Sequence, residues 1–116
     1  MLKPEILEKL ISFRRERDWE QFHNPKDLAI SLSIEAAELL EWFQWKTNDE
    51  ITAQLKSPKR QALEDELADV TAYLAYLCHD IGVDINQALA DKIDKNALKY
   101  PVDQVKSRSD KYTEYS

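Results

Sequence analysis

The sequence predicts an all-α protein, and three observations support this prediction. The chain has 116 residues but only one glycine and four prolines. Leucine, alanine, glutamate, lysine and glutamine, which favour helices, dominate its composition. Apolar residues recur at intervals of three and four along most of the chain, which is typical of amphipathic helices. We therefore expect one domain, a four-helix-bundle-like subunit over residues 1–101, followed by an irregular tail over residues 102–116.

The first half of the chain predicts two long helices. Pro4 suits the first turn of a helix, which we expect over residues 4–17. The following segment, 18–25, breaks the apolar periodicity and ends in Asn-Pro, a turn signal that also suits a helix start. The second helix is expected over residues 25–46 and is long for a globular protein.

The second half of the chain predicts a short helix and two more long helices. Polar capping residues precede each of them, and a glycine or an X-Pro pair follows the long ones. The expected boundary residues are Thr47 and Glu50 for the short helix, Ser57, Pro58 and Gly82 for the third long helix, and Asp84, Tyr100 and Pro101 for the last, over residues 85–99.

Charge and composition exclude several classes of protein. The formal net charge is −6, and no basic stripe runs along any segment, so polymeric nucleic acid is not an expected ligand. A single cysteine, Cys78, cannot form a disulfide within the chain. We find neither a signal peptide nor an apolar run of about 20 residues. These features favour a cytoplasmic protein without a membrane partner.

Two pairs of acidic residues stand out on the two longest predicted helices. Glu35 and Glu38 are three residues apart, as are Glu66 and Asp69, and this spacing places each pair on one helix face. Glu35 also falls within the apolar stripe that begins at Leu28. If the two helices pack antiparallel, the acids converge. Two unit charges about 4 Å apart repel by about 4 kcal/mol at an effective dielectric constant of about 20, so such a cluster must bind protons or a cation.

The ligand type favours a hard cation. Carboxylate oxygens without cysteine or histidine are typical of Mg²⁺, or of Mn²⁺, and Mg²⁺ held in this way is normally completed by phosphates and water. A di-iron bundle would need two Glu-x-x-His motifs, and only Glu20 and His23 supply one, within the broken segment. The acids therefore point to nucleotide chemistry.

These residues resemble the all-α nucleoside triphosphate pyrophosphatases, the MazG-like superfamily, whose pattern is E-x-x-E, a spacer and E-x-x-D. Further blocks resemble the dCTP pyrophosphatase branch, notably RERDWEQFHNPKDLAISLSIEAAELLEWFQWK, EDELADVTAYLAYLCHDIGVDINQAL, DKIDKNALKYP and SDKYTEY. The resemblance covers roughly residues 10 to 115. It implies Mg²⁺-dependent hydrolysis of a nucleoside triphosphate, dCTP or a modified dCTP, to monophosphate and pyrophosphate. A role in clearing unwanted nucleotides from the pool is implied as well.

The resemblance also implies roles for individual residues. Mg²⁺ would bind to Glu35, Glu38, Glu66 and Asp69. Trp45 would stack on the base, and Trp19 and His23 would line the base pocket. Phosphate and sugar would contact the last helix at Lys92, Asn96 and Tyr100. Glu38 and Glu41 are the candidates for positioning or deprotonating the attacking water, although Glu41 lies one 60° step further around the helix.

The sequence leaves three questions open. Many MazG-like members begin their motif with two adjacent acids, whereas Ile34 precedes Glu35 here, so the number of Mg²⁺ ions is undecided. The resemblance implies a homodimer or homotetramer with an active site shared between subunits. The alternative is a catalytically silent helical oligomerisation or regulatory module, whose acids only decorate its surface.

Overall fold

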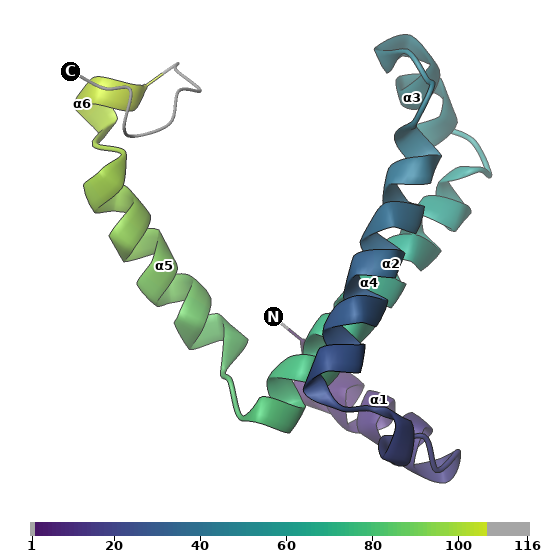
Figure 1. The fold of residues 1–116 in the computed structure, drawn as a ribbon. Coiled ribbons are helices and arrows are strands. Elements are labelled where there is room, and N and C mark those ends of the chain that lie inside the picture. Colours follow the sequence, from purple (N-terminus) through teal and green to yellow (C-terminus); the bar gives the residue numbers. More distant parts are fainter. Residues whose placement is uncertain (1, 107–116) are drawn as a thin grey trace. The chain divides into compact units, whose positions relative to one another are not determined.

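A computed structural model describes residues 2–106, and every regular element within this range is helical (Figure 1). In chain order the elements are α1 (Pro4–Glu16), the 3₁₀ turn η1 (Glu20–Phe22), α2 (Pro25–Phe43), α3 (Asn48–Leu55), α4 (Arg60–Ile81), α5 (Ile85–Lys99) and α6 (Val102–Val105). The predicted all-α class is confirmed. The chain divides into two compact units, Leu2–Gly82 and a second unit that begins at Val83.

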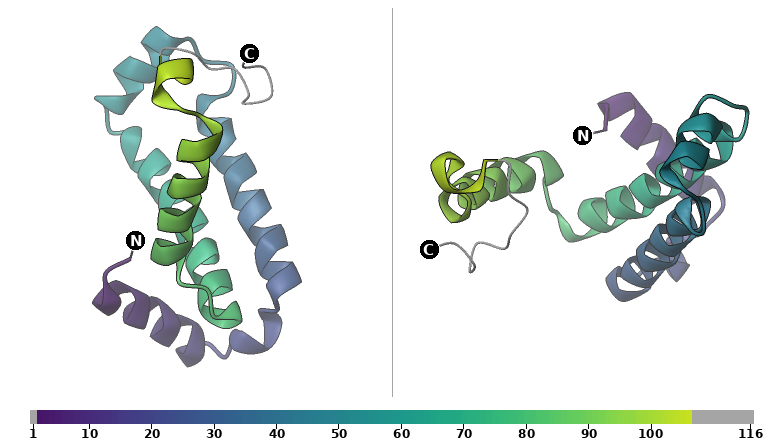
Figure 2. Two further views of the ribbon diagram at one scale, coloured as in Figure 1. Left: turned by 90° about the vertical axis from the view of Figure 1, so that its left-hand side faces the viewer. Right: turned by 90° about the horizontal axis from the view of Figure 1, so that it is seen from above.

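The unit Leu2–Gly82 is organised around α2 and α4. These two helices pack side by side and run in opposite directions (Figure 2), and α1 packs against α4. The buried cluster joins one residue from each of these helices, Ile11, Leu28 and Tyr76. Leu28 is only 1% exposed. The antiparallel pairing of the two helices that carry the acids is therefore present.

The start of α2 agrees with the sequence, but its end does not. Asn24 is the N-cap, and its side-chain oxygen accepts a hydrogen bond from the backbone N–H of Asp27 at 2.9 Å. The helix ends at Phe43, not at Lys46 as predicted. Trp45 has a φ of +66°, which lies in the left-handed region and cannot continue a right-handed helix.

The connection to α4 differs from the prediction as well. Thr47 caps α3 as expected, accepting a hydrogen bond from the Glu50 N–H at 3.1 Å. Ser57, however, does not cap α4, which begins at Arg60. Its hydroxyl donates to the Gln54 carbonyl at 2.8 Å and so closes the turn after α3. The serine and its proline therefore form a turn before the helix, not the first residues of the helix.

Single residues explain where α4 ends and where α5 begins. Gly82 ends α4 with a φ of +75°, a left-handed conformation that glycine adopts without a steric penalty. The Asp84 carboxylate caps α5 by accepting from the N–H groups of Asn86 and Gln87 at 3.0 and 3.2 Å. The predicted tail begins with the short helix α6, and residues 107–116 lie outside the described range. None of the described helices combines the length and apolar character needed to cross a membrane.

Candidate functional site

The first acid pair lies in the middle of α2. Glu35 and Glu38 are ten and thirteen residues beyond Pro25 and lie within α2, so the intact helical backbone holds both carboxylates. Glu35 is half-buried, as its position within the apolar stripe predicts. Glu41, one further step along, is exposed. The α2 face that meets α4 therefore carries Glu35 and Glu38.

The second acid pair, Glu66 and Asp69, lies on α4. Carboxylate oxygens of Glu35, Glu38 and Glu66 all lie within 4.8 Å of one another. Asp69 is exposed and lies outside this group, although its charge still acts on both Glu35 and Glu66. The structure thus brings together three of the four acids that the sequence singled out. We call Glu35, Glu38 and Glu66 the acid group.

The electrostatics of the acid group reflect crowding of like charges. Burial, followed by the neighbouring Glu38 carboxyl, raises the pKa of Glu35 to about 7. Burial and the charges of Glu38 and Asp69 also raise the pKa of Glu66. Both shifts have the sign expected for carboxylates that face other carboxylates away from full solvation.

Two oxygens of the acid group have no hydrogen-bond partner. Oε2 of Glu35 and Oε2 of Glu66 are buried and accept no hydrogen bond. Buried polar atoms are normally paired, and a buried anionic oxygen without a partner is costly. A bound proton or a hard cation would satisfy both oxygens, and the donor set of oxygens alone fits Mg²⁺ or Mn²⁺. Among the residues of the described range, no histidine or cysteine joins this group.

The three aromatic candidates lie at opposite ends of α2. Trp19 and His23 precede the N-terminus of the helix, whereas Trp45 follows its C-terminus. A helix of 19 residues is about 28 Å long. Trp45 is 92% exposed, and Trp19 is 44% exposed and packs edge-on against Phe13 with ring centroids 5.6 Å apart. Within one chain, Trp45 and His23 therefore cannot contact the same small molecule.

The candidates on the last helix belong to the second unit. Lys92 is exposed on α5, and Asn96 is half-buried. Tyr100 follows the helix as its C-cap, and its N–H donates to the Asn96 carbonyl at 2.8 Å. Lys92 and Asn96 are four residues apart within α5 and so share one face of the helix, whereas Tyr100 has a φ of −125° and lies beyond the helix end.

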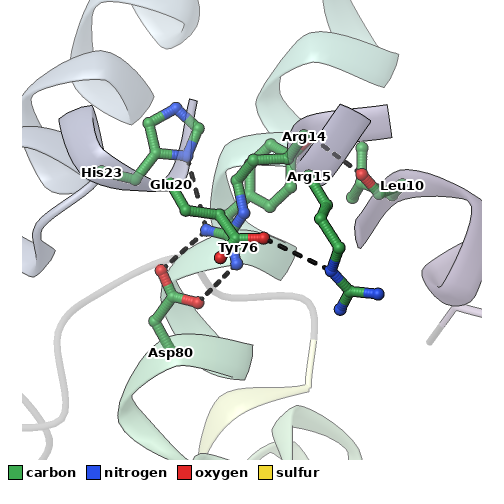
Figure 3. Close-up of polar contacts among 7 residues, drawn as sticks. All are labelled: Leu10, Arg14, Arg15, Glu20, His23, Tyr76 and Asp80. Carbon is green, nitrogen blue, oxygen red and sulfur yellow. Dashed lines mark hydrogen bonds and ion pairs between the residues drawn. The ribbon is translucent and has the colours of Figure 1, made fainter. Parts of the chain in front are cut away.

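The core of the unit Leu2–Gly82 contains an ion pair that was not predicted from the sequence. Arg14 is 4% exposed and forms a two-pronged ion pair with Asp80, next to Tyr76 and His23 (Figure 3). In the sequence Arg14 is the first of several consecutive charged residues, a pattern typical of a solvent-exposed segment. One signal was available, since Arg14 lies seven residues after Leu7 and three after Ile11, on the apolar face of α1.

The antiparallel helices and the acid group define an all-α protein with a carboxylate site between α2 and α4. The chain belongs to the MazG-like family, whose sequence profile matches residues 30–115. A pyrophosphatase from Archaeoglobus fulgidus has a similar structure, with a TM-score of 0.77 and 45% sequence identity over 84% of this chain and 90% of that one.

Curated relatives agree with this family. The chain is 48% identical over 103 residues to dCTP pyrophosphatase 1 of Homo sapiens and 46% identical over 103 residues to dCTP pyrophosphatase 1 of Mus musculus. Each alignment covers 88% of this chain and 61% of the relative, so the chain spans less than two thirds of the length of these proteins. The resemblance to the dCTP pyrophosphatase branch is confirmed.

Proposed function

We propose that this chain is a Mg²⁺-dependent nucleoside triphosphate pyrophosphohydrolase, with dCTP or a modified dCTP as substrate. The observation that carries the proposal is the acid group, which joins two antiparallel helices in a member of the MazG-like family. The names of the curated relatives, dCTP pyrophosphatase 1, support the choice of cytosine. Removing non-standard or surplus nucleotides is the corresponding role in the cell.

The acid group supplies the ligands for the cation. Glu35, Glu38 and Glu66 would hold Mg²⁺, with Mn²⁺ as a substitute, and Asp69 would complete the set from the same face of α4. The buried, unpaired oxygens of Glu35 and Glu66 support this assignment, since a cation would give each a partner. When bound, the cation would offset negative charge on the phosphate oxygens and lower the pKa of a water molecule.

The reaction needs a group that accepts a proton from water. The water oxygen forms a bond to the α-phosphorus, the bond from that phosphorus to the oxygen bridging to the β-phosphorus breaks, and pyrophosphate leaves. We assign the proton acceptor to Glu38 or Glu41, which lie one helical step apart on α2. Glu38 belongs to the acid group, and Glu41, three residues later, is exposed.

The base pocket would be shared between two copies of the chain. We assign base stacking to Trp45 and the pocket walls to Trp19 and His23. The length of α2, about 28 Å, keeps Trp45 and His23 of one copy too far apart to contact one base. The proposal therefore requires a homodimer or homotetramer. Apolar side chains on α2 that are about half exposed, Ile30, Ile34 and Leu40, are available for burial in such an assembly.

The remaining assignments concern the second unit and the extent of the domain. Lys92, Asn96 and Tyr100 would hold the phosphates and the sugar, because a cation and a hydrogen-bonding side chain share one face of α5 and a second hydrogen-bonding side chain follows at the end of the helix. We propose that the catalytic domain spans residues 1–101 and that residues 102–116 form a tail outside it. The alternative, a catalytically silent helical oligomerisation module, has no need for the acid group.

One experiment separates these alternatives. The purified protein is incubated with each of the eight common ribo- and deoxynucleoside triphosphates, with Mg²⁺ or with EDTA, and pyrophosphate and phosphate are assayed separately. We expect dCMP and pyrophosphate from dCTP, and we expect this activity to be lost with EDTA and in the Glu38→Gln variant. The Glu64→Gln variant should retain the activity, because Glu64 is an exposed residue of α4 outside the acid group. Release of orthophosphate would contradict attack at the α-phosphorus. If neither the common triphosphates nor 5-substituted dCTP react, the silent module is correct.

A further inference from the structure

The Arg14–Asp80 ion pair holds a charged guanidinium in a fixed position inside the unit Leu2–Gly82. Nη1 and Nη2 of Arg14 donate to the two carboxylate oxygens of Asp80 at 2.8 and 2.9 Å (Figure 3). The Arg14 side chain is 5% exposed, and its guanidinium carbon lies 4.7 Å from the centre of the Tyr76 ring. Two-pronged hydrogen bonds and ring stacking leave the guanidinium little freedom to rotate. The proposed reaction has no direct use for this pair.

The same guanidinium reaches the imidazole of His23. Nη1 of Arg14 lies 3.4 Å from Nδ1 of His23, a long hydrogen bond. Arginine has donors only, so Nδ1 of His23 can face it only as an acceptor. A neutral imidazole with an acceptor at Nδ1 carries its proton on Nε2. The ion pair thus selects one of the two neutral forms of the ring.

The other neighbours of His23 favour the same neutral form. Burial, followed by the charge of Arg14, lowers the pKa of His23, and the Asp80 charge opposes this only in part. The rings of Tyr76 and Tyr73 lie 5.2 and 6.4 Å from the imidazole, centre to centre, and hold its plane. In Figure 3 the second ring nitrogen of His23 is on the side away from the ion pair.

We propose that Arg14 and Asp80 are positioning residues that hold His23 neutral with its proton on Nε2, so that His23 offers a nucleobase one hydrogen-bond donor. This inference rests on the proposed function, which puts His23 in the base pocket. The N–H group at Nε2 of His23 favours a base that presents a hydrogen-bond acceptor, either a carbonyl oxygen or an unprotonated ring nitrogen such as N3 of cytosine. It disfavours a base that presents a ring N–H there, such as N3–H of uracil or thymine, because two donors then face each other.

The direct test is the protonation of the imidazole nitrogens, read by nitrogen-15 NMR of the whole protein at about pH 8, where an ordinary histidine is neutral. The chain has two histidines, and a His79→Gln variant assigns the signals. We expect His23 Nδ1 to be unprotonated and Nε2 protonated in the wild type, and a mixture of both neutral forms in Arg14→Met. Arg60→Met, which breaks the exposed Arg60–Glu64 pair, is the matched control and should leave the signals unchanged. A proton on Nδ1, or averaged signals in the wild type, overturns the proposal.

Kinetics supply the second readout. Arg14→Met should raise KM for dCTP several-fold with little change in kcat, since it acts through base binding, and should have no further effect in a His23→Ala background. Equal effects of Arg14→Met with and without His23 would overturn the inference. If Arg14→Met does not fold, Arg14→Lys keeps the charge with fewer donors and undergoes the same NMR and kinetic tests. The NMR result needs no activity, so failure of the proposed function and failure of this inference give different outcomes.

Discussion

Glu35 on α2 and Glu66 on α4 approach each other across an antiparallel helix pair, with carboxylate oxygens within 4.8 Å and one buried oxygen of each left without a hydrogen bond. Such a contact between like charges opposes the packing of the helices that create it. A bound cation would reverse the sign of the interaction. The stability of this protein should therefore respond to divalent cations and to pH in a way that the acid group determines.

Glu66→Gln should separate the two contributions of this carboxylate. Without a cation the variant should melt at or above the wild-type temperature, because one repulsive charge is gone. With Mg²⁺ at about a hundred times its dissociation constant, the wild type should gain about 2.7 kcal/mol, and the variant should lose most of this gain together with its activity. Thermal melts with EDTA and with Mg²⁺ measure both. Equal stabilisation of Glu66→Gln and the Glu64→Gln control by Mg²⁺ would place the cation elsewhere.

The raised pKa of Glu35 predicts how the cation-free protein responds to pH. Its folded-state pKa is about 7, compared with an ordinary value of 4.5, so between these pH values the folded state binds more protons than the unfolded state. Stability in EDTA should therefore fall as pH rises from 4.5 to 7, and Glu35→Gln should flatten this slope. Mg²⁺ binding near neutral pH should release protons, which calorimetry in buffers of different ionisation enthalpy detects. No buffer dependence would contradict a protonated Glu35.

Trp45 should be a residue whose replacement stabilises the fold. Its φ of +66° is strained for a side chain of this size, and its 92% exposure means that little packing offsets the strain. Trp45→Gly should therefore raise the unfolding free energy by about 1 kcal/mol. Loss of base stacking should at the same time raise KM about tenfold or more. Chemical denaturation and steady-state kinetics measure the two effects, and Trp45→Asn, which also tolerates this φ, is the control. A destabilised Trp45→Gly would mean that the ring packs in the assembled protein.

Asp80 should set part of the stability at neutral pH. Its hydrogen bonds with Arg14, and then the Arg14 charge, lower its pKa below the ordinary 3.8, although burial opposes them. The folded state thus binds fewer protons than the unfolded state. The contribution of Asp80 to the free energy of unfolding is therefore present above pH 3.8 and is lost as pH falls through the folded-state pKa. Asp80→Asn should cost about 2 kcal/mol at neutral pH, and the difference from wild type should shrink in acid. Glu64→Gln, in an exposed pair, should cost less than about 0.5 kcal/mol. Similar costs for the two variants would show that the buried pair adds nothing.

The sequence by itself determined the helical class, most helix boundaries and the identity of the acids. These features depend on local chemistry, namely the spacing of apolar residues, the side chains of Asn24 and Asp84 at helix starts, and a glycine at position 82. Predictions from the sequence failed at positions where local signals compete. Ser57-Pro58 is equally compatible with a helix start and a turn, and a left-handed tryptophan at position 45 has no sequence signature.

Only the tertiary structure decided which charged side chains meet. Glu38 and Glu66 are 28 positions apart and Arg14 and Asp80 are 66 apart, and no periodicity within one helix relates such residues. The antiparallel packing of α2 and α4 selected Glu66 but not Asp69 for the acid group, although both share one helix face. The packing of α1 against α4 buried Arg14, which resembled a solvated arginine in the sequence. Contacts between helices depend on their relative rotation and distance, and the pattern along each helix leaves both quantities free.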